Sequence, residues 1–383
     1  MIYLDHAATS NPKPASVAEA MVHFISEGCA NPGRGSHPLA NDAARLIFET
    51  RENLLDFFHA GENAQAVFTG NITQSLNLVL KGVVKPGDQV ITSSMEHNAM
   101  MRPLRELEQI GVVVTVIPCD VKSGLINPGD IAEAITAKTR MIAMNHGSNT
   151  FGTVQPIEEI GRLCQKQGIL FLLDTAQSAG VIPIDMDASH IDYLAFTGHK
   201  GLLGPMGTGG LILSEKAQRE KIKPLFTGGT GSNSELEVQP DFLPDALESG
   251  TPNLPGIAGL NAGIHWLKEK GIENISRHEQ ELTAFLVSSL RAIPKVSVYG
   301  HAEEAQHVGV ISFSIDGKDI GEIDAQLAYE HQICCRTGLH CSPASHKTMG
   351  TFPQGTIRLS IGAFTSREEI TRVIEVITSL AEN

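Results

Sequence analysis

Side chains that could do chemistry follow five apolar, β-branched stretches of the sequence. In an open α/β sheet, ligands bind outside the carboxyl ends of the strands, so residues just past each stretch are the first candidates for a site. They are Ile72 and Thr73, Glu96 and His97, His146 and Asn149, Asp174 and Gln177, and Thr197, His199 and Lys200.

Each of these residues also has a purely structural interpretation. Thr73 could cap a helix, His97 could lie in a solvated loop, Asn149 could serve a turn and Asp174 could be an N-cap. The succession of strand ends favours a site, because together they offer a helix start that suits a phosphate, a flat ring to stack, a carboxylate and an amine. These are the parts that one cofactor needs.

The elements that must position these residues follow an alternating pattern. Short β-branched runs alternate with amphipathic stretches over 65–215, which predicts a doubly wound α/β domain with a mostly parallel sheet. The expected strands are 65–69, 89–93, 112–117, 140–145, 169–174, 192–197 and 210–214, and the expected helices are 73–81, 99–109, 128–137 and 156–167.

The alternation of strands and helices ends at a loop-rich segment, 218–256, which predicts a domain boundary. Beyond it, helices are expected at 257–270, 273–291, 319–331 and 366–381, with strands at 296–300, 308–315 and 356–361. That order predicts a smaller α+β domain. We therefore expect an N-terminal segment at 1–15 that packs on the small domain, a large domain at 16–255 and a small C-terminal domain at 256–383.

Composition excludes some classes of function. The formal charge of −14 and the absence of basic tracts argue against binding to nucleic acid or to anionic membranes. The start MIYLDHAATS has no apolar leader, so we expect a cytoplasmic protein. The six cysteines are too few and too irregular for a disulfide scaffold, and Cys29, Cys119 and Cys164 lie in apolar stretches where they are expected to pack.

Seven short motifs in order give the chain a family resemblance. LDHAAT, EHNAM, SNTFGT, DTAQ, TGHK, ESGTPN and RTGLHC resemble the cysteine desulfurase branch of the class V aminotransferase superfamily, over essentially the whole chain. The resemblance implies fold type I, a pyridoxal 5'-phosphate cofactor and a homodimer whose active sites draw on both subunits.

The resemblance also implies roles for the residues around the cofactor. Lys200 would form the Schiff base, Asp174 would pair with the pyridine nitrogen, Gln177 would bond the phenolic oxygen, and His97 would stack on the ring and relay a proton. The phosphate would be held by Ile72, Thr73, Thr197 and His199, with Thr251 from the neighbouring subunit.

For the substrate, the resemblance implies sulfur transfer from L-cysteine to Cys341, with alanine as product. The thiolate is the nucleophile, and nearby Arg336, His340 and His346 are expected to lower its pKa. The residues expected to bind substrate are Arg358, which would clamp the carboxylate, Asn149, Arg336 and, from an entrance loop, His37. An exposed turn is an equal alternative for His37.

The sequence departs from the family pattern in places. His6 replaces the usual asparagine of the first motif, Leu339 precedes His340 where two histidines are frequent, and the phosphate turn reads GNITQ. The short linker from Cys341 to Arg358 resembles the second desulfurase group, whose compact loop often relies on a dedicated sulfur-acceptor protein.

Several alternatives remain open at this point. Selenocysteine is a further candidate substrate, and iron-sulfur cluster assembly, thiolated tRNA and selenium metabolism are candidate destinations. Cys334 and Cys335 could end a buried strand, receive sulfur or bind zinc, although their spacing matches no paired zinc framework. A class V transaminase, β-lyase or epimerase would need no protein thiol, and a catalytically idle scaffold or zinc-binding interaction protein would need no cofactor.

Overall fold

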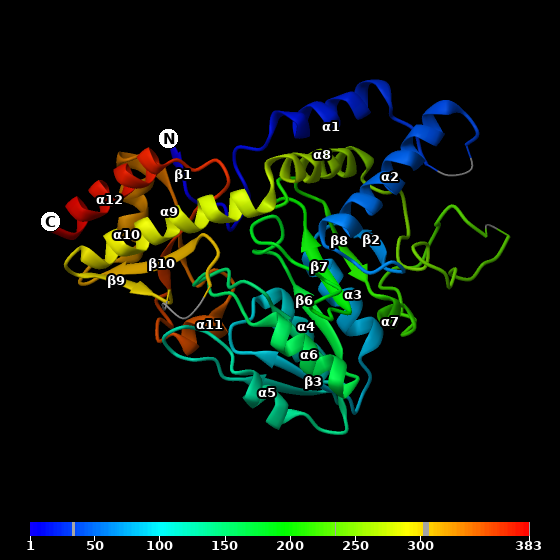
Figure 1. The fold of residues 1–383 in the computed structure, drawn as a ribbon, viewed down its shortest axis with the longest axis horizontal. Coiled ribbons are helices and arrows are strands. Elements are labelled where there is room, and N and C mark those ends of the chain that lie inside the picture. The colour runs from blue at the N-terminus through cyan, green and yellow to red at the C-terminus, as the bar shows by residue number, and fades with distance from the viewer. Residues whose placement is uncertain (33–34, 234, 302–305, 383) are drawn as a thin grey trace.

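A seven-stranded sheet forms the centre of the computed structural model, which describes residues 1–32, 35–233, 235–301 and 306–382 (Figure 1). The strand order is β2-β8-β7-β6-β5-β3-β4. The bounds are β2 Gln65–Thr69, β3 Gln89–Ser93, β4 Val113–Ile117, β5 Thr139–Asn145, β6 Leu170–Asp174, β7 Tyr193–Thr197 and β8 Gly209–Leu213. Only β8 runs antiparallel to its neighbours among these strands, so β2 keeps the direction of the other five.

Helices cover both faces of this sheet, and its central strands are therefore buried on both sides. One face packs against α3 Ile72–Val83 and α4 Asn98–Glu108. The opposite face packs against α5 Pro128–Ala134, α6 Ile157–Gln167 and α8 Leu254–Lys270. Two further helices, α1 Ala15–Glu27 and α2 Pro38–Phe57, pack on α8 (Figure 1).

The reversed strand β8 fits between β2 and β7 because it begins with two glycines. A Cβ atom at Gly209 would lie 2.8 Å from the Cα of Asn71, and one at Gly210 would lie 2.4 Å from the ring of Phe196. A side chain at Gly209 would therefore push away the turn that follows β2, and one at Gly210 would push against Phe196 of β7. The close approach fixes that turn beside the end of β7.

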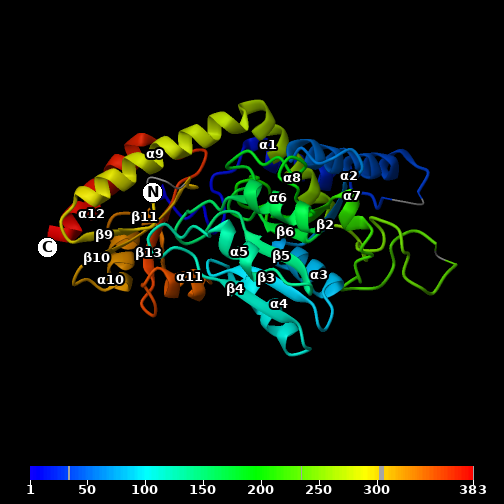
Figure 2. The ribbon, with the colours of Figure 1, turned by 60° about the horizontal axis from the view of Figure 1, so that its bottom comes forward.

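A second, four-stranded antiparallel sheet forms the C-terminal part of the structure (Figure 2). Its order is β12 Arg336–Gly338, β13 Thr356–Ser360, β10 Val310–Ile315 and β9 Val296–Tyr299. The helices α9 Ile272–Ala292 and α12 Arg367–Glu382 pack on it around a separate apolar core. The remaining helices are α7 Glu215–Gln218, α10 Ile320–Ala325, the π-helix Gln326–Glu330 and α11 Pro343–Thr348.

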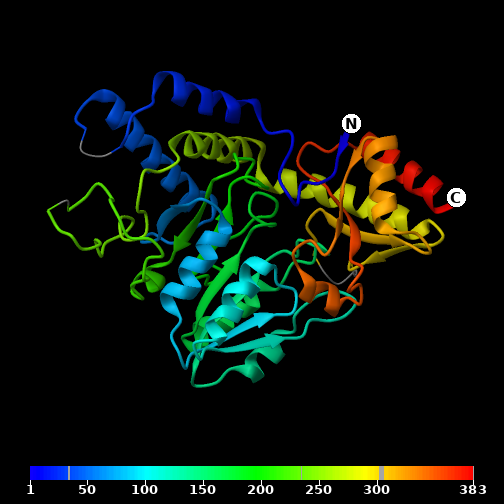
Figure 3. The same ribbon diagram turned by 180° about the vertical axis from the view of Figure 1, so that it is seen from behind.

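The N-terminal segment lies against the C-terminal elements (Figure 3). Strand β1, Ile2–Tyr3, pairs in parallel with β11, Ile333–Cys334. The Ser360 amide then donates to the carbonyl of Leu4. These contacts support the proposal that segment 1–15 packs on the small domain, whereas α8 packs on the central sheet although most of it follows the proposed boundary at residue 255.

The predicted fold class is confirmed, and all seven expected strands belong to the central sheet. The helix expected at 128–137 ends at residue 134, and the one expected at 319–331 is a short α-helix followed by a π-helix. The elements α1, α2, α7, β1, β12 and α11 were not expected, whereas β11 agrees with the alternative in which Cys334 and Cys335 end a strand. Within the described residues, no helix is long and apolar enough to cross a membrane.

Candidate active site

A cavity of about 250 Å³ lies at the carboxyl ends of five strands of the central sheet. It brings together nine of the residues predicted from the sequence: Ile72, Thr73, His97, Asn149, Asp174, Gln177, Thr197, His199 and Lys200. Asn71, Ala99, Asn145, Gly147 and Ala176 complete the lining. Because these strands run in the same direction, their ends meet at one edge, and residues 128 positions apart in sequence share one site.

The turn after β2 presents the start of a helix to this cavity. Asn71 is the N-cap of α3, and its Oδ1 accepts a hydrogen bond from the Gln74 amide at 3.0 Å. Ile72 and Thr73 are the first residues of the helix, where N–H groups have no partner within the helix and the dipole favours an anion. The turn therefore suits a phosphate group.

Lys200 follows β7 and lines the cavity as a half-buried side chain, together with the buried Asp174, which ends β6. Burial lowers the pKa of Lys200 to about 8, although the Asp174 carboxylate opposes the shift. Burial raises the pKa of Asp174, while the Ala176 amide, which donates to Oδ1 at 2.9 Å, and Lys200 favour its charged form. The site thus holds an amine that loses its proton easily and a shielded carboxyl group.

His97 is the N-cap of α4 and lines the same cavity. Burial, followed by the charge of Lys200, lowers its pKa to about 4, so the imidazole is neutral near pH 7. Its Nδ1 accepts a hydrogen bond from the Ala99 amide at 3.0 Å. The proton of the neutral ring is therefore on Nε2, and the alternative of a solvated loop residue is wrong.

Two buried polar atoms of cavity residues have no hydrogen-bond partner within the described parts of the chain. They are Nδ1 of His199 and Oδ1 of Asn145. Unpaired buried polar atoms are costly, so a polar ligand is expected to satisfy them. With an anion-binding helix start, an amine and a carboxyl group in one cavity, the residues fit a phosphorylated pyridine aldehyde.

Cys341 is the exposed residue of a loop after β12, and its backbone is anchored to the edge of the cavity. Its carbonyl accepts a hydrogen bond from the amide of Asn98, the residue after His97, at 2.8 Å. The thiol-bearing residue and the cavity that contains Lys200 therefore lie on one side of the molecule. His340 and Cys341 both adopt left-handed backbone conformations, with φ of 48° and 59°, which cost roughly 1 kcal/mol or more each for residues with side chains.

Two histidines near this loop are buried and uncharged. Burial lowers the pKa of His340 to about 2 and that of His346 to about 4. Neither histidine therefore carries the positive charge near pH 7 that the sequence analysis expected of it, because sequence proximity does not reveal burial. Arg336, whose side chain is half exposed, keeps its charge there.

Arg336 and Arg358 share one counterion, Asp5, which the sequence analysis did not single out. Oδ2 of Asp5 accepts from Nη2 of Arg336 at 2.8 Å, and Oδ1 accepts from Nη2 of Arg358 at 3.0 Å. Arg358 is 3% exposed, also donates to the carbonyl of Asn149, and leaves its Nε without a partner among the described residues. Asp5 belongs to the LDHAAT motif, which was the available signal.

Two other predicted residues do not line this cavity. Thr251 lines a separate, open cavity of about 850 Å³ that also contains Gly70 and Gln74 of the phosphate turn. His37 is the N-cap of α2, where its Nδ1 accepts from the Ala40 amide at 3.3 Å. Contact of either residue with the cofactor or substrate stays a prediction.

The remaining cysteines have ordinary surroundings. The Cys335 thiol donates to Oδ1 of Asp324 at 3.1 Å, and burial raises its pKa. Cys334 is half-buried at the end of β11. Cys29 is exposed, so the expectation that it packs in the core is wrong, whereas Cys119 and Cys164 are buried. Across the residues described, no group of three or more histidine, cysteine or acidic side chains could hold a metal ion.

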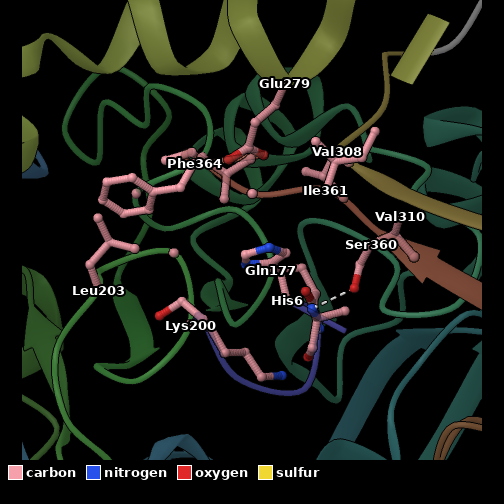
Figure 4. Close-up of a pocket in the computed structure, with 18 residues that line it drawn as sticks. His6, Gln177, Lys200, Leu203, Glu279, Val308, Val310, Ser360, Ile361 and Phe364 are labelled. Carbon is pink, nitrogen blue, oxygen red and sulfur yellow. Dashed lines mark hydrogen bonds between the residues drawn. The ribbon is translucent and has the colours of Figure 1, made fainter. Parts of the chain in front are cut away.

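A smaller cavity of about 30 Å³ adjoins Lys200 on the side of the C-terminal domain (Figure 4). It is lined by His6 and Ser10 of the N-terminal segment, by Ser360 and by Glu279 of α9, whose carboxyl group points into it. Burial raises the pKa of Glu279 to about 8. No described residue donates a hydrogen bond to this carboxyl group, and sequence reasoning gave no signal for it.

Comparison with known proteins places this geometry in a family. The family model described as aminotransferase class-V matches residues 2–373. A probable cysteine desulfurase of Methanothermobacter thermautotrophicus is 35% identical, over 99% of this chain and 94% of that protein, and a cysteine desulfurase of Yersinia pseudotuberculosis is 32% identical, over 98% and 92%.

The solved structures agree with the sequence relatives. The apo structure of a cysteine desulfurase from Thermococcus onnurineus superposes with a TM-score of 0.92 at 34% identity, covering 100% of this chain and 94% of that one. A cysteine desulfurase from Escherichia coli gives 0.88 at 27%, covering 99% and 94%. The chain therefore belongs to the class-V aminotransferase family, and within it to the cysteine desulfurases.

Proposed function

We propose that this protein is a pyridoxal-phosphate-dependent cysteine desulfurase that converts L-cysteine to L-alanine and keeps the sulfur as a persulfide on Cys341. One observation carries the proposal: an exposed cysteine is hydrogen-bonded through its backbone to the edge of a cavity that contains a lysine of lowered pKa. A desulfurase needs both groups, because the amine must bind the cofactor and the thiol must take the sulfur.

The cavity residues divide the work of holding the cofactor. When bound, the pyridine ring supplies an electron sink for the negative charge that develops on the substrate's α-carbon. The proposed contacts are Lys200 with the aldehyde carbon, Asp174 with the ring nitrogen, Gln177 with the phenolic oxygen, His97 with the ring face, Ile72, Thr73, Thr197 and His199 with the phosphate, and Thr251 of the neighbouring subunit with the same phosphate.

The chain's own groups then move the protons and the sulfur. Lys200, with a pKa of about 8, takes the α-proton as a neutral amine. The Cys341 thiolate attacks the substrate's Sγ, so that an S–S bond forms while the C–S bond breaks and its electron pair stays on the β-carbon. Alanine forms when that β-carbon is protonated and the α-carbon regains the proton that Lys200 took. Arg358, with Asn149 and Arg336 beside it, is proposed to bind the carboxylate, and Asp5 fixes both guanidinium groups.

Replacing Cys341 tests the assignment. We expect Cys341→Ala to lower alanine formation from L-cysteine by about a thousandfold or more, because it removes the thiol that attacks the substrate sulfur, while the purified protein keeps the yellow colour of bound cofactor. Alanine is measured by chromatography after incubation with L-cysteine and a thiol reductant.

Cys29→Ala is the matched control, since Cys29 is also exposed but lies far from the site in sequence, and it should keep full activity. A yellow protein in which Cys341→Ala still produces alanine at the original rate would contradict the proposal. Turnover of a different amino acid that survives this substitution would instead favour a class V transaminase, β-lyase or epimerase.

The same proposal extends to partners. We propose a cytoplasmic homodimer, supported by the open cavity around Thr251 and by exposed apolar side chains at Phe226, Val238 and Phe242. The short, docked cysteine loop supports a group II enzyme that passes sulfur to a dedicated acceptor protein, with iron-sulfur cluster assembly as a destination. Selenocysteine is proposed as a second substrate because it presents a soft atom at the same position.

A further inference from the structure

Asn149 holds both neighbours of Cys341 through buried hydrogen bonds. Ser342 Oγ donates to Oδ1 of Asn149 at 2.7 Å, and Nδ2 of Asn149 donates to the carbonyl of His340 at 2.7 Å. The Ser342 side chain is completely buried, and Asn149 is nearly so. One amide therefore binds the residues on either side of the reactive cysteine.

This pair of hydrogen bonds lies between the cavity and the loop. Asn149 lines the cavity with Lys200 and His97, whereas Ser342 belongs to the loop and does not. An amide nitrogen has two hydrogens, and described residues use only one of those on Asn149. The second remains available to a ligand in the cavity, so Asn149 can contact substrate while it holds the loop.

The loop needs such contacts because its backbone is strained. His340 and Cys341 are consecutive left-handed residues, and neither is a glycine. A side chain disfavours this conformation, which persists only where surrounding contacts determine it. The contacts that hold it include the bonds from Ser342 and Asn149 and the Asn98 amide that donates to the Cys341 carbonyl, besides the bond from the Ser342 amide to the Leu339 carbonyl and the contact of His340 with Thr356.

We infer that Ser342 is a positioning residue for the desulfurase reaction: through Asn149 it holds the loop so that the Cys341 thiol stays at the mouth of the cavity. The inference rests on the proposed role of Cys341 as sulfur acceptor. Ser342 itself touches neither cofactor nor substrate, and acts by limiting the positions that the thiol can take. Precise placement matters because a nucleophile displaced by about 1 Å can lose two orders of magnitude in rate.

The test is Ser342→Ala, followed by hydrogen exchange at the Asn98 amide. Asn98 is the first residue of α4, so its amide has no partner within the helix and its protection reports the bond to the Cys341 carbonyl. We expect exchange at Asn98 to become about tenfold faster or more. Exchange in β6 should be unchanged, which shows that the variant is folded.

The kinetic expectation separates positioning from substrate binding. In the holoenzyme, Ser342→Ala should lower kcat for alanine formation by about tenfold and leave KM for L-cysteine and the cofactor colour unchanged, because the substrate pocket is intact. Ser345→Ala is the matched control. Ser345 is equally buried three residues later, and its hydroxyl has no hydrogen-bond partner among the described residues, so exchange and kcat should stay at wild-type values.

The outcomes distinguish this inference from the proposed function. Unchanged Asn98 exchange and unchanged kcat in Ser342→Ala would overturn the positioning role, whatever Cys341→Ala does. The role is also overturned if Ser345→Ala has the same effect as Ser342→Ala. If exchange accelerates as expected but the wild-type holoenzyme produces no alanine, the loop contact stands and the desulfurase assignment fails.

Discussion

Lys200 illustrates how burial alone prepares a side chain for chemistry. An exposed lysine is almost fully protonated at neutral pH and cannot attack an aldehyde. The cavity around Lys200 disfavours its charged form, and the Asp174 carboxylate offsets only part of that effect. The amine is therefore reactive near neutral pH without a separate base to remove its proton.

This shift predicts how cofactor binding depends on pH. With a pKa of about 8 in place of 10.5, the neutral amine is about 300-fold more abundant at pH 7. We expect the rate at which cofactor-free protein regains its yellow colour with pyridoxal phosphate to rise with pH and to level off above about 8. A rate that still rises tenfold per unit up to pH 10 would contradict the lowered pKa.

Asp174→Asn tests the direction in which the Asp174 carboxylate shifts the pKa of Lys200. Asp174 raises the pKa of Lys200, so removing its charge should move the midpoint of the same profile to lower pH. The variant is compared with wild type in one buffer series at constant ionic strength.

Residues that follow strands could be predicted from sequence, whereas residues that act through distant partners could not. The position of Lys200 after a β-branched run is a local signal. Ser342 and Asn149 are 193 residues apart, and Asp5 and Arg358 are 353 apart, so no local pattern indicates either pair. The neutral state of His340 was missed for a related reason, since burial depends on the whole fold.

At the scale of elements, the first strand and the nearby Asp5 connect the two ends of the chain. Strand β1 is only two residues long and pairs with β11, which is equally short. Asp5 lies two residues after β1 and pairs with Arg336 of β12 and Arg358 of β13. The carboxylate therefore neutralises a buried arginine while it fixes the N-terminal segment.

Removing this carboxylate should destabilise the protein strongly. We expect Asp5→Asn to lower the free energy of unfolding by about 3 kcal/mol, because Arg358 would be left buried without its counterion. The measurement is urea unfolding at pH 7 followed by circular dichroism.

The exposed pair of Asp42 and Arg45 on α2 serves as the comparison for this prediction. Asp42→Asn should change stability by no more than about 0.5 kcal/mol, because water screens that pair. If Asp5→Asn and Asp42→Asn lower the free energy of unfolding equally, burial of Arg358 does not determine the cost of losing its counterion.

Strongly patterned elements were predicted well, and weakly patterned ones were not. The strands of the central sheet are continuous apolar runs because both faces are covered. Helix α1 buries only Val17 and Phe24 and has no side-chain cap, which leaves little signal. The short strands β1, β11 and β12 are defined by pairing with distant segments, and two or three residues cannot show an alternating pattern.

At the scale of the whole molecule, Glu279 lies where the two main sheets meet. It projects from α9 into the small cavity that His6 and Lys200 also line (Figure 4). Burial raises its pKa from 4.5 to about 8, so the folded protein binds a proton there that the unfolded chain releases. The resulting stabilisation is fully present below pH 4.5 and is lost as the pH rises through about 8.

Glu279→Gln should remove this pH dependence. Between pH 5 and 8, the free energy of unfolding of wild type should fall relative to that of the variant by up to about 1.4 kcal/mol per unit, since the glutamine does not titrate. The difference between the two proteins is the relevant quantity, because other buried groups titrate in both. It is measured by urea unfolding at each pH.

Glu281→Gln is the control, because Glu281 is exposed on the same helix. The free energy of unfolding of Glu281→Gln should change with pH in the same way as that of wild type between pH 5 and 8. A constant difference between wild type and Glu279→Gln from pH 5 to 8 would show that Glu279 is ionised in the folded protein.

The reversed strand β8 acts as a spacer of fixed width. It separates β2, which leads to the anion-binding turn, from β7, which leads to Lys200, and neighbouring strands lie about 4.8 Å apart. The two spacings, from β2 to β8 and from β8 to β7, place the axes of β2 and β7 roughly 10 Å apart. Backbone pairing and the glycines of β8, which have no side chains, impose this distance. The number of strands between the anion-binding turn and Lys200 therefore sets the length of a cofactor that can span from one to the other. Replacing side chains around the cavity would not change that distance.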